Sequence, residues 1–462
     1  MQQAENSMDH VAATMPNGVS GTSATGGSTW PLTATRDAAG ELQIAGVPVS
    51  EMVQQWGTPL YIYDVATLRA ACQGYMRTFA EADATSRVVY AGKAGMFRAL
   101  LQVIVEEGLG LDIVSAGELQ YAIACGVPAQ RINFHGNNKT PEELALALDF
   151  GINHIIVDNL SEIDLLRDLT RGRATPQDVL LRINPAVDVH THEYRKTGLP
   201  DSKFGLGIET GDAELAVQRL LEIPGVRLCG YHAHIGSQIF EAEPYLASVD
   251  VIVDFAAQMY RTYGVEPEEI NPGGGFGIPY LLDDPVTPVE RWAETLVRAV
   301  RVACERHDLP DPVLAIEPGR SIVGQAGIAV YTVGARKEIA GIRTYVSVDG
   351  GMADNIRPAL YGAEYTAAPV LLRADAETDR ETVTIAGKYC ESGDVLIQHI
   401  DLPRLQSGDL LAMPMAGAYC LAMSSNYNLA LRPAVVFVDD RGARLVQRRE
   451  TLEDLLRRDI DG

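Results

Sequence analysis

The chain has 462 residues, of which 47% are hydrophobic and 21% are charged, the balance of an ordinary globular protein. Its 61 acidic residues outnumber 38 basic ones, and no basic cluster interrupts this excess, which argues against nucleic acid or an anionic membrane surface as a partner. The longest uncharged apolar run, residues 410–423, is too short to span a bilayer and contains Pro414 and Gly417. We therefore expect a soluble protein of two domains.

Cysteine usage and the N-terminus indicate the compartment. The six cysteines are scattered, with no CxxC pair and no spacing typical of zinc ligands: Cys72, Cys125, Cys229, Cys304, Cys390 and Cys420. In a chain of this length, that pattern favours reduced thiols in a cytoplasmic protein over a disulfide framework. No basic segment followed by an apolar one opens the chain, so we expect no signal peptide. We also expect no metal site.

The first 57 residues precede the regular part of the chain. Residues 1–30 are rich in Ser, Thr, Gly and Ala and show no apolar period, so we expect a disordered tail. Residues 31–57 hold short strand-like pieces and one short helix-like piece, "SEMVQQW". These strands lack a sheet of their own, and we expect them to join the second domain.

A regular alternation of strands and helices follows over residues 58–320. Eight short apolar runs end in Gly, Asn, Ser or charged residues, and each but the last leads into a helical pattern: "RVVYAGK", "GLDIVSAG", "RINFHGN", "HIIVDN", "VLLRINP", "GYHAHIGS", "EINPGGG" and "VLAIEPGR". This alternation predicts a parallel sheet, and eight units predict a (β/α)8 barrel. Capping boxes mark two helix starts, Ser115 to Glu118 and Thr140 to Glu143.

The pattern changes after residue 320. Strand-like runs alternate with turn residues in "TYVSVDGG", "ETVTIAG", "DVLIQHI" and "AVVFVDDRGARLVQ", which predicts a mostly antiparallel β domain, a sandwich or barrel, over residues 321–462. The predicted fold class is therefore α/β plus β. It consists of a TIM-like (β/α)8 barrel and a C-terminal β domain that the N-terminal strands join.

Polar residues collect where the barrel strands end. In this fold the active site lies at the carboxyl ends of the strands. Those ends carry Lys93, Asp112, His135, Asp158, Arg182, His234, Ser237, Gly273, Gly274, Gly275, Glu317 and Arg320. Such a collection on an apolar scaffold is far less expected by chance than any single member.

Four of these groups form a chemical set. A shielded Lys93 loses its proton readily and becomes a nucleophile toward a carbonyl cofactor. Glycines 273–275, with Ser237, allow backbone amides to approach a phosphate. Glu317 suits a protonated pyridine nitrogen, and His234 suits the flat face of the ring. Each has a simpler reading alone: a surface lysine, a tight turn, a packed histidine. Together they indicate pyridoxal phosphate.

Longer motifs carry a family resemblance. They run from about residue 88 to residue 428 and include "YAGKAG", "FHGNNKT", "HAHIGSQI", "NPGGGFGIPY", "EPGRSIV", "CESGD" and "GAYCLAMSSNYN". In these stretches the chain resembles the diaminopimelate decarboxylases, within the alanine-racemase-like (fold type III) pyridoxal-phosphate enzymes. The resemblance implies a barrel plus β domain and a head-to-tail homodimer with active sites at the interface.

The resemblance also implies residue roles around the cofactor. Lys93 is the Schiff-base lysine, and His234 stacks on the ring. The residues that hold phosphate and pyridine nitrogen, or support the cofactor, are Asp112, Arg182, Ser237, Gly273, Gly274, Gly275, Glu317, Gly319, Arg320 and Tyr419.

Further roles implied by the resemblance concern the substrate. Arg320, Arg357 and Tyr361 grip its distal carboxylate, Glu391 takes its distal ammonium, and Tyr419 touches both phosphate and substrate. Cys390 comes from the partner subunit and delivers a proton to the carbanion that decarboxylation leaves. The simpler reading of Cys390 is a small buried hydrophobe, but "CESGD" is a poor core sequence.

The implied reaction is decarboxylation of meso-2,6-diaminopimelate to L-lysine and carbon dioxide, the last step of lysine biosynthesis, by a carbon–carbon lyase. Three alternatives stay open: a related decarboxylase of D-ornithine, D-lysine or another basic amino acid, a racemase of the same fold, and a pyridoxal-phosphate carrier. The pair Arg320 and Arg357 argues against the first, because such substrates have no distal carboxylate. "CESGD" and "RPALYG" argue against the second, and the full C-terminal domain argues against the third.

Overall fold

The computed structural model describes residues 29–187, 202–373, 376 and 378–460. The chain divides into two compact units, each described by itself. Of the described residues, those within 1–68, 279–284 and 324–462 belong to unit 1, and those within 69–278 and 285–323 belong to unit 2. The predicted disordered tail lies outside the described residues except for its last two.

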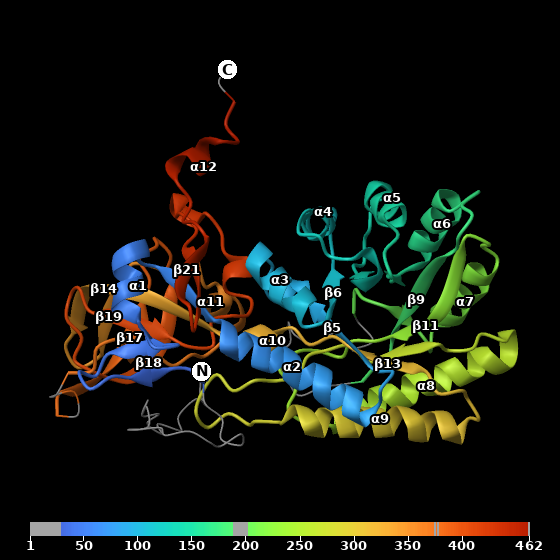
Figure 1. Cartoon of the computed structure of the whole chain (residues 1–462), viewed down its shortest axis with the longest axis horizontal. Helices are drawn as coiled ribbons and strands as arrows, with labels where there is room; N and C mark the ends of the chain where they lie inside the picture. Colours follow the sequence, from blue (N-terminus) through green and yellow to red (C-terminus); the bar gives the residue numbers. More distant parts are fainter. Residues whose placement is uncertain (1–28, 188–201, 374–375, 377, 461–462) are drawn as a thin grey trace. The chain divides into compact units, whose positions relative to one another are not determined.

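Unit 2 is a closed barrel of parallel strands (Figure 1). The strands are β5 (Arg87–Ala91), β6 (Gly110–Ile113), β7 (Ile132–Phe134), β8 (His154–Val157), β9 (Gln177–Asn184), β11 (Val226–His232), β12 (Glu269–Asn271) and β13 (Val313–Ile316), with the short β10 (Leu206–Gly207) beside β9. The order runs β9-β11-β12-β13-β5-β6-β7-β8, and pairing of β8 with β9 closes the ring. All eight predicted strands are present, which confirms the barrel.

Helices lie outside the ring, and α3 to α9 connect successive strands (Figure 1). They are α2 (Val65–Ala82), α3 (Arg98–Glu106), α4 (Ala116–Ala124), α5 (Pro141–Phe150), α6 (Leu160–Leu169), α7 (Asp212–Leu221), α8 (Glu243–Tyr263), α9 (Val289–Arg306) and α10 (Arg320–Val323), with single turns η1 (Gly92–Ala94) and η2 (Ala129–Arg131). Within the described ranges, no helix is long and apolar enough to cross a membrane.

The two predicted capping boxes have different outcomes. Thr140 and Glu143 form the complete box, in which each side chain accepts from the other's backbone amide. Ser115 accepts from the amide of Glu118, but the Glu118 carboxylate accepts from Val114 N at 2.6 Å instead of from Ser115 N. The box at Ser115 is therefore only half formed, because the Glu118 carboxylate accepts from the amide one residue before Ser115.

Unit 1 contains a nine-stranded sheet in the order β18-β17-β15-β14-β4-β20-β21, with β19 pairing β14 and β16. Its elements are β4 (Leu60–Asp64), β14 (Gly327–Ile339), β15 (Arg343–Val348), α11 (Arg357–Tyr361), β16 (Ala368–Pro369), β17 (Arg380–Ala386), β18 (Val395–Pro403), β19 (Leu410–Met413), η4 (Leu421–Met423), η5 (Tyr427–Leu429), β20 (Ala434–Asp439), β21 (Gly442–Gln447) and α12 (Leu452–Leu456). Among the strands that the structure describes in this unit, β15–β17 and β20–β4 pair in parallel and the other pairs are antiparallel, so the mostly antiparallel domain is confirmed.

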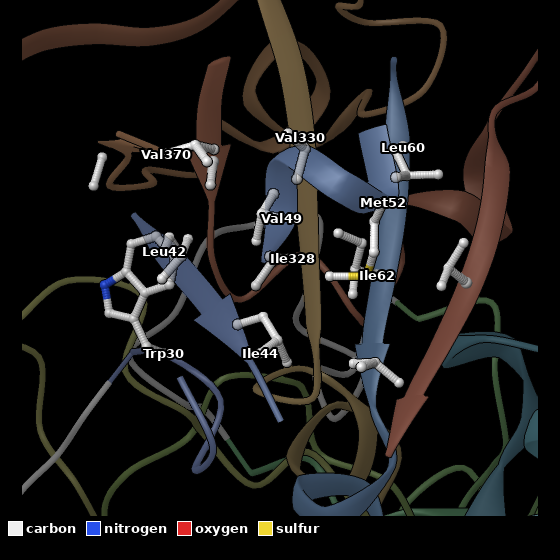
Figure 2. Packing of buried hydrophobic residues seen from close by; sticks show 14 of the residues in the cluster. Trp30, Leu42, Ile44, Val49, Met52, Leu60, Ile62, Ile328, Val330 and Val370 are labelled. Carbon is white, nitrogen blue, oxygen red and sulfur yellow. The ribbon is translucent and has the colours of Figure 1, made fainter. Parts of the chain in front are cut away.

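The N-terminal strands β1 (Thr35–Arg36), β2 (Leu42–Ile44) and β3 (Val47–Pro48) form a small antiparallel sheet, followed by α1 (Val49–Trp56). The expectation that they lack a sheet of their own is therefore wrong. They do join unit 1, because Leu42 N donates to Val370 O at 2.8 Å. One apolar cluster unites Leu42 and Ile44 with Ile328 and Val330 of β14 (Figure 2).

Candidate active site

The predicted barrel residues gather at the carboxyl ends of the strands. Lys93 lies in the turn η1 directly after β5, and Asp112 is the last residue but one of β6. Glu317 directly follows β13, and His234 follows β11 by two residues. Because the parallel strands of a barrel end at the same rim, these side chains share one end of unit 2.

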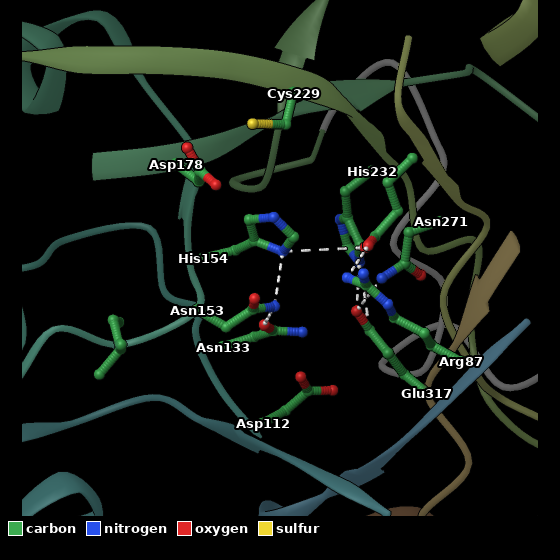
Figure 3. Close-up of polar contacts among 12 residues, drawn as sticks. Arg87, Asp112, Asn133, Asn153, His154, Asp178, Cys229, His232, Asn271 and Glu317 are labelled. Atoms are coloured by element: carbon green, nitrogen blue, oxygen red, sulfur yellow. Dashed lines mark hydrogen bonds and ion pairs between the residues drawn. The ribbon is translucent and has the colours of Figure 1, made fainter. Parts of the chain in front are cut away.

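Glu317 is a buried carboxylate held by side chains from other strands (Figure 3). Asn271 donates from Nδ2 to Oε1 at 2.8 Å, and the Nε2 atoms of His232 and His135 lie 3.2 and 3.3 Å from that oxygen. Burial by itself raises the pKa of Glu317, but the two histidines outweigh it and hold the pKa well below its usual range. A fixed negative charge therefore stands at this rim.

His135 links this carboxylate to a second one. Its Nε2 lies 3.2 Å from Asp112 Oδ1 and 3.3 Å from Glu317 Oε1, and all three side chains are buried. Burial by itself lowers the pKa of His135, but Glu317 and Asp112 raise it to about 9. Burial, and then the charge of Glu317, raise the pKa of Asp112 to about 6. A protonated imidazole therefore stands between the two acids.

The glycine triplet forms a turn in which no side chain fits. Gly273 and Gly275 have φ of 81° and 104°, a conformation that favours glycine. A Cβ on Gly274 would lie 1.9 Å from the carbonyl oxygen of Glu317, and one on Gly275 would lie 2.1 Å from that of Gly236. The backbone here is therefore bare, as close approach to an anion requires.

Ser237 and Arg320 add polar side chains to this region. Arg320 is buried and donates from Nη2 to Ser237 Oγ at 3.0 Å. Gly319 packs against β5, where a Cβ would lie 2.9 Å from the Ala91 side chain. A guanidinium, a hydroxyl and bare glycine backbone form a set of groups that suits a phosphate.

His234 and Arg182 lie at the same rim. His234 Nδ1 accepts from Gly274 N at 3.3 Å, and burial lowers the pKa of His234 well below its usual value, so the ring is neutral. The Arg182 guanidinium lies over the Phe204 ring, 4.6 Å from its centroid, and 3.6 Å from Asp158 Oδ2. Their stacking and supporting roles stay predictions.

Lys93 differs from the expectation in one respect. The predicted nucleophile is a shielded lysine, whereas the side chain is exposed. Burial is the largest cause of the lowered pKa of His234, and the positive charge of Lys93 is the next. The Lys93 amine therefore lies near that ring. The described residues therefore bring Lys93 to the site without covering it.

Arg357 is the notable predicted residue of unit 1. Its side chain is 2% exposed at the start of α11, and its guanidinium lies 4.6 Å from the centroid of the Tyr280 ring and 5.3 Å from that of Tyr365. It also donates to the Tyr365 hydroxyl. Among the described residues, no carboxylate pairs with it within 4.0 Å. A buried guanidinium without an anion suits a ligand that brings one.

Tyr361 lies in the same helix as Arg357, and Tyr419 lies in a loop that contacts Tyr365. Tyr361 is half-buried at the end of α11, and half-buried Tyr419 has a φ of 62° in the loop after β19. Tyr365 Oη lies 3.3 Å from Cys420 Sγ, so the loop that carries Tyr419 lies beside Arg357. Arg320 belongs to unit 2 and Arg357 to unit 1, so their joint grip on one substrate stays a prediction.

Cys390 is the one exposed cysteine of the six. Its amide donates to Asn428 Oδ1 at 3.1 Å, and the Tyr427 hydroxyl lies 3.5 Å from its carbonyl oxygen. Glu391, the predicted partner of the substrate ammonium, is also exposed. Cys390 is therefore not a small buried hydrophobe.

Sequence reasoning missed the partners of Glu317. His135 was recognised at the rim without a role, and His232 and Asn271 were not recognised at all. A signal existed for His232, because it precedes His234 by two residues and side chains of a strand face the same side with period two. Asn271 stands directly before Pro272 and the glycine triplet, which marks the end of β12.

Comparison with known proteins places these features in a family. Residues 65–324 match the family model described as pyridoxal-dependent decarboxylase, pyridoxal binding domain. The chain is 46% identical over 428 residues to a diaminopimelate decarboxylase of Bacillus subtilis, covering 93% of this chain and 97% of that one. It is 45% identical over 421 residues to the Halalkalibacterium halodurans protein of that name, covering 91% and 95%.

A solved structure gives the same result. The structure of diaminopimelate decarboxylase from M. jannaschii in co-complex with L-lysine matches with a TM-score of 0.86 and 34% identity. The match covers 93% of this chain and 98% of that one. The likeness therefore extends over both units.

Proposed function

The chain belongs to the diaminopimelate decarboxylase family of pyridoxal-dependent decarboxylases, and we propose that it converts meso-2,6-diaminopimelate to L-lysine and carbon dioxide. The enzyme is a lyase, the reaction is the last step of lysine biosynthesis, and pyridoxal phosphate is the cofactor. The observation that carries the choice of substrate is Arg357, a buried guanidinium without a carboxylate partner among the described residues. Such a group favours a substrate with a second, distal carboxylate.

The barrel rim fits the cofactor. Glu317 stays ionised and so pairs with a protonated ring nitrogen. The bare turn Gly273–Gly275, with Ser237 and Arg320, suits the phosphate. Lys93 supplies the amine that holds the cofactor. When bound, pyridoxal phosphate draws electrons away from the bond that breaks at the α-carbon.

Residues of the chain hold the substrate. Arg357 and Arg320 bind the distal carboxylate by their guanidinium forks, and Tyr361 adds a hydroxyl. Glu391 binds the distal ammonium, and Tyr419 contacts phosphate and substrate. A substrate without either distal charge leaves a buried group unpaired, which discriminates strongly against it.

Cys390 protonates the α-carbon as the general acid after carbon dioxide leaves. In our proposal it comes from the partner subunit of a homodimer whose active sites lie at the interface. The exposure of Cys390 in the single chain supports this role, since an exposed thiol is free to enter another subunit's site.

The domain division and the compartment belong to the same proposal. We assign cofactor binding to residues 58–320, and the family match over residues 65–324 supports this. Residues 31–57 and 321–462 are then assigned to the β domain, to whose sheet β4 (Leu60–Asp64) also belongs. We place the enzyme in the cytoplasm, which suits a chain whose six cysteines are all unpaired.

The test is product analysis with purified enzyme loaded with pyridoxal phosphate. Incubation with meso-diaminopimelate should give L-lysine and carbon dioxide in equal amounts, and D-lysine and D-ornithine should not be consumed. Turnover of D-lysine or D-ornithine with no turnover of meso-diaminopimelate would contradict the substrate. Interconversion of amino-acid enantiomers without carbon dioxide would contradict the reaction class.

A further inference from the structure

A second group of polar side chains lies at the opposite end of the barrel from Glu317. His154 is the first residue of β8, Asp178 the second of β9 and Cys229 the fourth of β11. Their three ligand atoms, an imidazole nitrogen, a carboxylate oxygen and a sulfur, all lie within 4.8 Å of one another. The sequence shows no metal-ligand spacing, because these residues come from three strands that only the barrel brings together.

A β-bulge brings Cys229 into this group. Along β11 and β9, Leu228 pairs with Val179 and Gly230 pairs with Leu180, so Cys229 is an extra residue that pairs with no residue of β9. Bulges of this kind re-aim a side chain. The Cys229 side chain is 2% exposed and packs in one cluster with Leu180 and Ile156.

The imidazole of His154 is oriented for a ligand role. Its Nδ1 faces Asn153 Nδ2 at 2.9 Å and Glu269 Oε1 at 3.9 Å, and the rest of the ring faces Asp178 and Cys229 (Figure 3). The Asn153 amide lies beside Nδ1 and holds the ring in this orientation.

Asp178 retains binding capacity and is partly exposed to solvent. Arg227 donates to its two oxygens at 2.8 and 2.6 Å, which uses one lone pair on each and leaves the other. The side chains of Arg227 and Asp178 are 48% and 34% exposed. Asp178 is therefore the member of the cluster that is in contact with solvent.

We propose that His154, Asp178 and Cys229 form a zinc site at the amino-terminal end of the barrel. Nitrogen, sulfur and oxygen ligands in this combination are those that Zn²⁺ prefers, with water as the fourth. Binding forms a zinc–sulfur bond and releases the thiol proton of Cys229 to water. The ion ties β8, β9 and β11, which are neighbours in the ring, and takes no part in the decarboxylation.

The test uses the holoenzyme, treated with a chelator and then dialysed against Zn²⁺. Metal analysis should find one zinc per chain, and X-ray absorption should show one zinc–sulfur distance of about 2.3 Å. Cys229→Ala and His154→Gln should each weaken binding at least tenfold, and Cys229→Ala should abolish the sulfur signal. Zn²⁺ should raise the Tm of the wild type but not of either variant.

Two matched controls separate this site from other thiols. Cys304→Ala removes a buried cysteine in α9, and Cys390→Ala removes the exposed one. Both should bind Zn²⁺ like the wild type. Wild-type enzyme that takes up no zinc, a zinc spectrum without sulfur, or unchanged affinity in Cys229→Ala and His154→Gln would each overturn the proposal. The wild-type spectrum decides the question even if a variant fails to fold.

Discussion

His135 Nε2 lies 3.3 Å from Glu317 Oε1, and the same nitrogen lies 3.2 Å from Asp112 Oδ1. Because the two acids raise the pKa of His135 to about 9, above its ordinary 6.5, the folded chain holds a proton there that the unfolded chain releases. The contribution of His135 to the free energy of unfolding is therefore fully present below about pH 6.5 and is lost as the pH rises through about 9.

His135→Gln tests this linkage. We expect the variant to lose on the order of 3 kcal/mol of stability at low pH, since each pKa unit corresponds to about 1.4 kcal/mol. The Tm difference from the wild type should shrink as the pH rises toward about 10. The imidazole signal that disappears from the NMR spectrum of the variant should titrate near pH 9 in the wild type.

The matched control is His307→Gln. His307 Nε2 lies 2.6 Å from Asp254 Oδ1 on the surface of unit 2. A surface pair of this kind contributes only about 0–1 kcal/mol to the free energy of unfolding. Its Tm should differ little from the wild type at any pH. A Tm difference for His135→Gln that is the same at both ends of the pH range would show that His135 does not carry the linked proton.

Arg357→Lys tests the recognition of the distal carboxylate. Lysine keeps the charge but lacks the planar fork, so kcat/KM for meso-diaminopimelate should fall by about 10²-fold or more. The absorbance of the bound cofactor should not change, because no role at the cofactor is assigned to Arg357. Arg343→Lys is the control, since its guanidinium lies 5.6 Å from the Tyr345 ring centroid without a predicted substrate role. Equal losses of kcat/KM in the two variants would contradict the assignment.

A buried ion pair in unit 2 gives a stability prediction. Lys139 Nζ donates to Glu162 Oε1 at 2.8 Å and to the carbonyl oxygens of Ile156 and Gly136 at 2.7 and 2.9 Å. Lys139→Met leaves the buried Glu162 carboxylate without its cation, so unfolding should become easier by about 3–5 kcal/mol. Denaturant unfolding of the barrel measures this loss.

The control for that variant removes an exposed cation. Arg171 Nη2 lies 3.2 Å from Asp168 Oδ1, and the two side chains are 79% and 75% exposed. Arg171→Met should cost at most about 1 kcal/mol. If Lys139→Met were no more destabilising than Arg171→Met, the ion pair of Lys139 with Glu162 would not contribute to the stability of the barrel.

The barrel and its rim were predictable because their signal is local. Each strand is a short apolar run whose end is marked by the next turn, and parallel strands bring their ends together without further information. Lys93, Asp112 and Glu317 were found in this way. The hydroxyl–guanidinium contact of Ser237 and Arg320 follows from two such strand ends.

Features that depend on pairing between distant strands were not predictable. Leu60–Asp64 reads as one more apolar strand, and nothing local shows that it pairs with β14 and β20. The residues that contact Glu317 depend on the register between strands. The contacts of His232 and Asn271 with Glu317 were therefore not predictable from local sequence. The exposure of Lys93 likewise depends on what surrounds it in space, which a run of apolar residues does not reveal.

The proposed homodimer with a shared active site leads to a complementation experiment. In the proposed mechanism Lys93→Ala removes the amine that holds the cofactor and Cys390→Ser removes the proton donor, so we expect each variant alone to be nearly inactive. If Cys390 serves the partner's site, a heterodimer of the two variants contains one intact site. Random reassociation should then restore about a quarter of the wild-type activity, because half of the dimers are mixed and half of their sites are whole.

The controls of this experiment decide between the two arrangements of Cys390. Lys93→Ala should lose the visible absorbance of the bound cofactor, whereas Cys390→Ser should keep it, which shows that the second variant is folded and loaded. The double variant Lys93→Ala/Cys390→Ser, mixed with wild type, should restore nothing beyond the activity of wild-type dimers. In every mixed dimer, one site then has the lysine without the cysteine and the other has the cysteine without the lysine. Recovery with that double variant, and none between the two single variants, would mean that Cys390 acts within its own subunit.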